Sequence, residues 1–152
     1  MATGRAGELL HLSKSKSRVL AITVPIRDSF DPILPSDLAQ LELELGSSLP
    51  QDYKAFLLRH NGGYFEDEVR YPYLEPCPYG DFGIIRGFLG LNVGYDYADI
   101  RDHIKVLIDW NIASDLMPIG DDIFGNPICI SIEGRTYGKA FFWYSGMTKR
   151  EC

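Results

Sequence analysis

The clearest hydrophobic repeat of the chain lies between residues 49 and 63, which read LPQDYKAFLLRHNGG. Apolar and aromatic side chains recur there at intervals of three and four residues, which is the period of one helical face; they are Tyr53, Phe56, Leu57 and His60. Pro50 suits the first helical position, where no amide donor is needed, and Asp52 complements the helix dipole. This pattern predicts a helix that begins at Pro50 and stops at Gly62 and Gly63.

The Asn61-Gly62 pair also fits a β-hairpin, because Asn-Gly between two alternating segments is the strongest short signal for that turn. The helical period, however, continues up to His60, and glycine after a helix is the usual left-handed stop. We therefore interpret residues 61–63 as the end of a helix rather than as the tip of a hairpin.

Residues 34–46 allow two interpretations. Alternate leucines in this segment have the period of a strand, whereas one helical face would hold Leu38, Leu41 and Leu45. N-cap oxygens at residues 36–37 and a stop at Gly46 favour the helix. Residues 97–110 predict a third helix, capped by Asp96, whose apolar face holds Tyr97, Ile100, Ile104, Leu107 and Ile108.

Strand patterns follow in the second half of the chain. Residues 64–81 are rich in proline and predict a loop, and residues 82–91 predict a strand with glycine irregularities. Residues 116–145 predict a three-stranded β-meander, in which Gly125 and Asn126 form a tight turn. The pattern as a whole predicts an α+β fold, with a mainly antiparallel sheet that ends in a β-meander and is flanked by about three helices.

The 152 residues suit one domain, and 45% of them are hydrophobic, so a core is expected. Residues 1–17 are polar and predict a flexible tail, residues 18–26 predict a strand, and residues 18–152 form the predicted domain. No apolar run is long enough to span a membrane and no signal peptide is recognised, so we expect a cytoplasmic protein without membrane contact. Three cysteines without CxxC spacing indicate free thiols.

The charge is uneven. Residues 61–134 hold thirteen Asp or Glu against four Lys or Arg, a local net charge of −9, which leaves +3 for the rest of a chain whose total is −6. An acidic middle argues against nucleic acid, because a phosphate backbone requires a basic surface. It fits a basic protein partner, although acidic residues that only keep a small protein in solution explain it equally well.

Candidate chemistry is sparse, and we predict no catalytic residue, metal site or cofactor. Asp121 and Asp122 would hold Mg²⁺ or act as an acid and a base. Adjacent residues of a strand point to opposite faces, however, and aspartate before a turn commonly bonds its own backbone, so a structural role is favoured. The scattered histidines lack the spacing of a metal site.

Acidic and aromatic residues of the middle segment are the better candidates for binding a partner. Glu66, Asp67 and Glu68 lack the spacing of a calcium loop, so they are either a solvated acidic loop or part of a partner surface. Tyrosine is frequent at recognition surfaces because it combines a rigid ring with a polar tip. The predicted partner-binding residues are Glu66, Asp67, Glu68, Tyr71, Tyr73, Asp121 and Asp122.

The segment from Leu49 to Gly63 resembles the LPxDYxxFLxxxNGG signature of the SUKH superfamily, which includes fungal cell-wall-assembly regulators and many bacterial proteins. The residues that match it are Leu49, Pro50, Asp52, Tyr53, Phe56, Leu57, Asn61, Gly62 and Gly63. The helix before it and the meander around Gly125-Asn126 are also similar, so the resemblance spans roughly residues 34–145. These motif residues are expected to hold the fold.

The resemblance implies an α+β fold without catalysis. It also implies one of two functions: an immunity protein that binds a toxin of a polymorphic or contact-dependent system, or a regulatory interaction protein of the cell-wall-regulator type. The chain departs from the family pattern after Ser145, where a further helix often follows, and in residues 64–81, which are unusually rich in proline, tyrosine and acid. The function of that segment cannot be carried over from the family.

Overall fold

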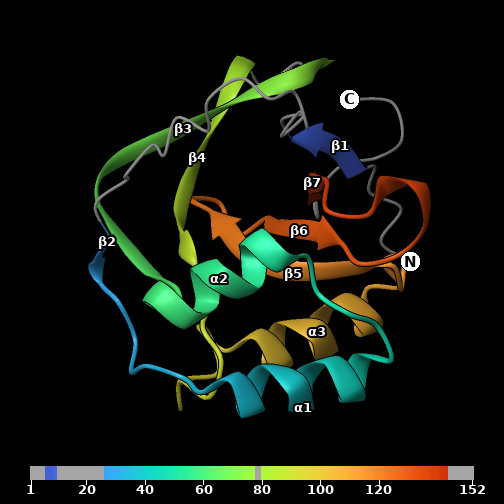
Figure 1. The fold of residues 1–152 in the computed structure, drawn as a ribbon. Coiled ribbons are helices and arrows are strands. Elements are labelled where there is room, and N and C mark those ends of the chain that lie inside the picture. The colour runs from blue at the N-terminus through green and yellow to red at the C-terminus, as the bar shows by residue number, and fades with distance from the viewer. Residues whose placement is uncertain (1–5, 10–25, 78–79, 144–152) are drawn as a thin grey trace.

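Three helices pack against one antiparallel sheet, which confirms the predicted α+β class (Figure 1). The structure is a computed structural model that describes residues 6–9, 26–77 and 80–143, with the side chains of 26–72 and 80–143. Its elements are β1 (Ala6–Leu9), β2 (Ile26–Asp28), α1 (Pro35–Leu45), α2 (Gln51–His60), β3 (Gly63–Cys77), β4 (Gly80–Phe88), α3 (Ile100–Asp109), β5 (Leu116–Asp122), β6 (Pro127–Ser131), η1 (Gly134–Thr136) and β7 (Ala140–Trp143). No helix of the described residues is long and apolar enough to cross a membrane.

The sheet has the order β1-β7-β6-β5-β4-β3-β2, and every neighbouring pair is antiparallel. β5, β6 and β7 form the predicted meander, with β7 as an inner strand between β6 and β1. One leucine or isoleucine of each helix is fully buried in the main core: Leu41, Leu57 and Ile100. The alternate side chains of β6 divide between two clusters: Ile128 and Ile130 join this main core, while Cys129 joins a second cluster with Leu107 of α3.

Residues 64–81 are not the loop that their prolines predicted. Most of them form β3 and the start of β4, two long strands that reach away from the helices (Figure 1). Pro72 lies directly opposite Phe82 in this pairing. Pairing between strands overrides the local preference of the residues, because proline removes only its own amide donor and leaves its neighbours able to pair.

The N-terminal predictions lie largely outside the described residues, which do not include 1–5 or 10–25. Residues 6–9, inside the segment predicted as a flexible tail, instead form β1 and pair with β7. Of the strand predicted at 18–26, only Ile26 is described, and it begins β2. The division into a tail and a domain at residue 18 stays a prediction.

The helix ends differ from the prediction in detail. α1 occupies the predicted segment and stops at Gly46, which adopts the left-handed conformation at φ 68°. Asp37 does not cap it from the N-cap position; its carboxylate accepts the backbone N–H of Leu34 at 2.7 Å. α3 is capped by Asp99 rather than Asp96, because the Asp99 carboxylate accepts the amide of Arg101 at 2.9 Å.

α2 carries the motif residues that we expected to hold the fold. Pro50 stands one position before the first helical residue, and Asp52 lies in the first turn. Tyr53 and Leu57 are buried, whereas Phe56 is half-buried and meets Phe88 edge to face, with 4.9 Å between ring centroids. The predicted helical face is therefore the one that packs on the sheet.

Asn61, and not the two glycines after it, is the left-handed residue that ends α2, at φ 47°. Its side chain is 1% exposed and joins three segments of the chain. The side-chain nitrogen donates to the carbonyl oxygens of Asp31 at 2.7 Å and Leu91 at 3.0 Å, and the side-chain oxygen accepts the Leu91 amide at 2.8 Å. Asparagine both tolerates this backbone conformation and satisfies these buried groups, which glycine would leave unpaired.

Gly62 and Gly63 are required for close approach rather than for stopping the helix. Both have positive φ, at 76° and 125°. A Cβ on Gly62 would lie 2.4 Å from the carbonyl oxygen of Leu89, and one on Gly63 would lie 2.7 Å from that of Asp28. The chain can therefore pass between β2 and the exit of β4 only if these two residues lack side chains.

We expect Asn61→Ala to lower the free energy of unfolding by about 4 kcal/mol. The change leaves buried backbone groups without a hydrogen-bond partner, and it places alanine in a left-handed conformation that alanine disfavours. Asn111→Ala is the matched control, because Asn111 also has positive φ (55°) but is exposed. Its loss should be about 1 kcal/mol. Urea unfolding of both variants measures the difference, and equal losses would show that the Asn61 side-chain bonds contribute little.

Glu42 generates a prediction about pH. Its carboxylate accepts the Leu49 amide at 2.8 Å and pairs with Lys54 at 3.0 Å, which ties α1 to α2. Burial raises the pKa of Glu42, but the Leu49 amide and Lys54 outweigh it, so the pKa lies below its ordinary value of 4.5. A lowered folded-state pKa stabilises the protein above the unfolded-state pKa, and this contribution is lost as the pH falls through the folded-state pKa.

Glu42→Gln should therefore lower the free energy of unfolding by about 1 kcal/mol at pH 7. The difference from the wild type should shrink at pH 3, where Glu42 is increasingly protonated in the parent protein. Urea unfolding at the two pH values measures it. A difference that stays constant between them would mean that the charge of Glu42 is not what ties the helices together.

Candidate partner-binding surface

The acidic triplet lies on a large bulge of β3. The regular pairing of β3 with β4 is interrupted between Tyr64, which pairs with Gly87, and Val69, which pairs with Ile85. On β4, only Arg86 lies between these two partners. Residues 65–68 therefore oppose a single residue, and we call them the acidic bulge. A bulge changes the direction of side chains that would otherwise follow the sheet, and bulges are common beside functional sites.

Three of the four residues in the acidic bulge face solvent, namely Glu66, Asp67 and Glu68. Phe65 instead points to the core side, where its ring meets Phe88 edge to face at 5.3 Å between centroids. Glu68 forms an ion pair with Arg70, whose guanidinium lies 4.4 Å above the Phe82 ring. In the part of the chain that the structure describes, Glu66 and Asp67 have no ion-pair partner.

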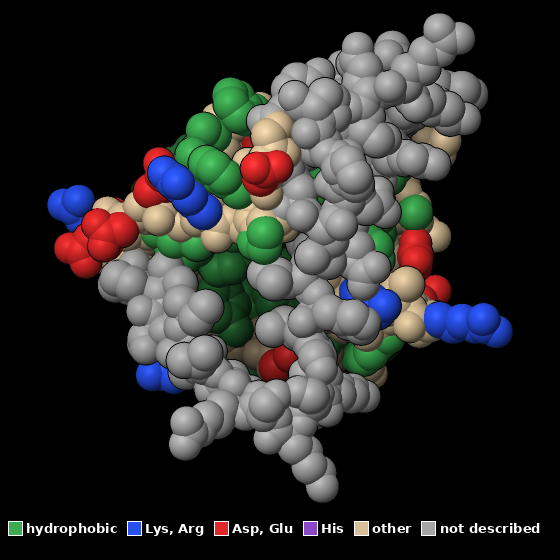
Figure 2. Space-filling view, turned by 90° about the horizontal axis from the view of Figure 1, so that it is seen from above, with side chains coloured by type: hydrophobic (Ala, Val, Ile, Leu, Met, Phe, Trp, Pro, Cys, Tyr) green, Lys and Arg blue, Asp and Glu red, His purple; other side chains and the backbone are tan. Residues whose placement is uncertain are grey.

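Charged side chains line part of the border in the view from above (Figure 2). Red and blue side chains gather at the left-hand edge, on the side where Figure 1 places β2 and the lower part of β3. Apolar side chains lie behind them toward the centre. At this side, charged groups therefore lie at the border of the molecule.

The two tyrosines predicted to bind a partner have different outcomes. Tyr71 is 3% exposed, and its ring fills the space over Gly83, where a Cβ would lie 2.2 Å from the ring. It also packs against Phe142, with 6.0 Å between centroids. Tyr71 is therefore a core residue, which corrects our prediction. The side chain of Tyr73 lies outside the described residues, so its role stays a prediction.

Asp121 is held inside the sheet rather than offered to a partner. It is 6% exposed, and Arg86 binds both of its oxygens, with the Nε–H donating at 3.2 Å. Burial raises the pKa of Asp121, and the pairing with Arg86 offsets this in part. Because its charge is already balanced, Asp121 does not belong to a free acidic surface, and we remove it from the predicted site.

Asp122 shapes the hairpin between β5 and β6. It is 2% exposed, and one oxygen accepts the amides of Phe124 at 2.9 Å and Asn126 at 2.8 Å. Its second oxygen accepts the Asn126 side-chain amide at 2.9 Å. Gly125 adopts φ 81° in the same turn. The geometry therefore supports the structural role favoured for this aspartate. Asp122 is not part of an exposed partner surface, which corrects our prediction.

The described residues contain no group of three His, Cys, Asp or Glu side chains that would hold a metal ion. Two histidines fall within the described residues, and they lie on different helices. His60 packs on Phe56 at 5.5 Å between ring centroids, and the Nε2 of His103 contacts the carbonyl oxygen of Tyr97 at 3.0 Å. Both contacts suit packing and positioning roles.

The sequence predictions missed a group of residues beside the acidic bulge. Arg86 sits opposite the bulge on β4, and its guanidinium is half-exposed. Tyr95 and Tyr97 follow β4 in the chain, and neither was predicted to bind a partner. Tyr97 was placed on the apolar face of a helix that in fact begins at Ile100, so its exposure could not be seen from the helical period.

Residues 32–152 match the SMI1 / KNR4 family (SUKH-1). The SPbeta prophage-derived uncharacterized protein YokK of Bacillus subtilis (strain 168) is 33% identical over 119 residues, which cover 70% of this chain and 59% of YokK. The uncharacterized protein YnaB of the same strain is 42% identical over 45 residues, 30% of this chain and 31% of YnaB. The matched part of the chain is therefore less than two thirds of either relative's length. No solved structure matches the chain.

Proposed function

The chain belongs to the SMI1 / KNR4 family (SUKH-1), and on this premise we propose that it is an immunity protein that binds and neutralises a protein toxin in the cytoplasm. Family membership supports a toxin-immunity or regulatory domain in general, and domains of this family are generally non-enzymatic. The toxin would belong to a polymorphic or contact-dependent system. Neutralisation would occur by covering a surface of the toxin, without a chemical step.

The acidic bulge is the observation that carries this proposal. It stands directly after the residues that anchor α2, and its four residues oppose one residue of β4. The pairing of the sheet does not require such an insertion. Its solvent-facing side chains are all acidic, and two of them have no ion-pair partner within the described residues. An insertion that exposes uncompensated charge is best explained by a partner of opposite charge.

The electrostatics of the chain support a basic partner. The total charge is −6, and exposed carboxylates on one border attract a basic surface over about 8–10 Å at physiological salt. Such attraction mainly accelerates association and selects the partner, while affinity depends on the centre of the interface. Fast association suits an inhibitor that must reach its toxin before damage occurs.

A regulatory interaction protein of the cell-wall-regulator type is the alternative within the same family. It would use the same kind of surface, so the two functions differ in the partner rather than in the fold. The genomic neighbourhood separates the two functions: a toxin gene beside the gene for this chain would favour immunity. YokK, the prophage-derived relative, supports the choice of immunity over regulation, because it shows that one similar protein is encoded by a prophage.

The test is growth rescue together with binding kinetics. Where a toxin gene lies beside the gene for this chain, expression of its toxin domain should stop growth, and co-expression of the chain should restore it. In vitro, Glu66→Lys/Asp67→Lys should slow association with that toxin by about tenfold at low salt, because the double reversal replaces attraction with repulsion. Stopped-flow or surface-plasmon measurements at two salt concentrations would give the rates.

Asp109→Lys/Glu133→Lys is the matched control, because it makes the same change in charge at exposed positions on α3 and after β6. It should slow association much less. Failure of the wild-type chain to rescue growth would overturn the immunity function. Equal slowing by both double variants would instead show that only the total charge matters, and would remove the acidic bulge from the interface.

A further inference from the structure

A pair of stacked tyrosines stands exposed in the segment between β4 and α3. The ring centroids of Tyr95 and Tyr97 are 5.7 Å apart and their planes differ by 27°. The two side chains are 56% and 60% exposed. Exposed aromatic rings in mutual contact bury little surface of their own, so their packing against each other does not explain why both are kept in solvent.

The backbone that carries the pair is firmly held. The carbonyl oxygen of Tyr95 accepts the amides of Ala98 at 2.9 Å and Asp99 at 3.1 Å. The Asp99 carboxylate accepts the amide of Val93 at 2.9 Å, and His103 contacts the carbonyl oxygen of Tyr97. A surface that is ordered before a partner arrives loses less conformational entropy on binding than a mobile loop.

A third tyrosine links this pair to the acidic bulge. Tyr64 immediately precedes the bulge, and its ring meets the edge of Phe30 at 6.1 Å between centroids. Tyr64 pairs with Gly87 on β4, and the amide of Gly90, three residues further along the chain, donates to the carbonyl oxygen of Ala98 at 2.9 Å. Tyr64 and the segment of the stacked pair therefore meet the same end of β4. Burial raises the pKa of Tyr64, and Tyr97 adds to this increase. We call Tyr64, Tyr95 and Tyr97 the tyrosine patch.

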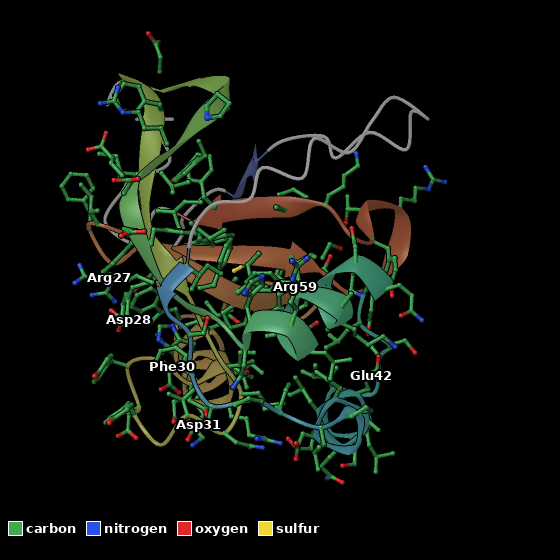
Figure 3. All side chains as sticks on the ribbon, turned by 60° about the vertical axis from the view of Figure 1, so that its left-hand side comes forward. Arg27, Asp28, Phe30, Asp31, Glu42 and Arg59 are labelled. Carbon is green, nitrogen blue, oxygen red and sulfur yellow. The ribbon has the colours of Figure 1, made fainter. Side chains whose placement is uncertain are left out.

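Two exposed carboxylates lie next to members of the tyrosine patch. Asp96 lies between the stacked tyrosines in the chain, and Asp28 is the register partner of Tyr64 on β2; both are exposed. Figure 3 shows Asp28 and Arg27 at the outer border of the molecule, with Phe30 below them and Arg59 and Glu42 on the side of the helices. Arg27 adds one positive charge here. The charge of Arg86 is balanced by Asp121, so the excess beside the tyrosine patch is negative.

We propose that the tyrosine patch binds an arginine or lysine side chain of a protein partner. Tyrosine faces attract cations through the ring quadrupole, and Asp96 would supply the opposite charge. The acidic bulge would guide the partner toward this position, and the tyrosine patch would form the centre of the contact, where tyrosine is enriched among residues that dominate binding. The identity of the partner rests on the proposed function, whereas the chemistry of the site does not.

Single-stranded nucleic acid is the competing ligand, because exposed tyrosines also stack on bases. Nucleic-acid sites combine aromatic rings with basic residues that neutralise phosphate. The exposed residues next to the tyrosine patch in sequence or in strand register include one basic side chain, Arg27, against four carboxylates: Asp28, Glu66, Asp67 and Asp96. Charge complementarity therefore favours a cationic protein side chain.

The first test uses a peptide and does not depend on any toxin. The ¹⁵N-labelled chain is titrated with the peptide Gly-Arg-Gly-Arg-Gly and with its citrulline counterpart, in which each arginine is replaced by a neutral side chain of the same shape. Amide shifts should concentrate at Tyr64 and residues 94–98. The citrulline peptide should bind at least about tenfold more weakly, because it lacks the cation.

Three variants and one oligonucleotide sharpen this test. Tyr95→Ala/Tyr97→Ala should abolish the localised shifts, and Tyr95→Phe/Tyr97→Phe should keep them, because the ring faces remain. Phe124→Ala is the matched control, since Phe124 is an aromatic residue that is 83% exposed, on the β5–β6 turn; it should bind as the wild type does. Shifts that spread over all exposed carboxylates, survive the double alanine change, or occur more strongly with an eight-residue uridine oligonucleotide would overturn the proposal.

The second test uses the toxin complex, if growth rescue has established one. Tyr95→Ala/Tyr97→Ala should raise its dissociation constant at least about tenfold, mainly through faster dissociation. An unchanged dissociation constant would show that the partner does not use the tyrosine patch. If the wild-type chain binds no toxin, the proposed function fails, while the peptide titration still decides whether the tyrosine patch binds a cation.

Discussion

The buried side chain of Asn61 is the contact on which the arrangement of this protein depends. It binds the backbone at Asp31 and at Leu91, which precede α1 and follow β4, while its own backbone ends α2. One amide group thus fixes three segments that are far apart in the sequence. The glycines after it allow β3 to leave between β2 and the exit of β4, so the position of β3, and of everything it carries, follows from this point.

Residues that hold the fold and residues that face solvent are only a few positions apart in the sequence. The motif from Leu49 to Gly63 is used almost entirely in packing, capping and close approach. The acidic bulge begins two residues later, and the sheet can accommodate it because β3 resumes its pairing at Val69. Side chains on the bulge can change without disturbing the core.

Carboxylates play opposite roles on the two sides of this division. Asp122 uses both oxygens to build a turn, and Asp121 is neutralised by Arg86 within the sheet, so neither contributes a free charge. Glu66 and Asp67 keep their charge in solvent. The tyrosine patch lies beside these exposed acids, and the pairing of rings with carboxylates gives this border of the molecule a preference for cations that neither group would produce alone.

The sequence by itself determined the elements with a strong local period. The helical face around Leu57, the left-handed stop at Gly46 and the meander turn at Gly125-Asn126 were all readable, because each depends on neighbours within about one turn of chain. The family could also be recognised from the motif that follows Leu49. Only the tertiary structure decided the rest: that the proline-rich segment is a strand, and that Tyr71 and Asp121 are buried. Each of these depends on strands or loops brought together from distant parts of the sequence, and no local pattern encodes which side of a strand its partner will cover.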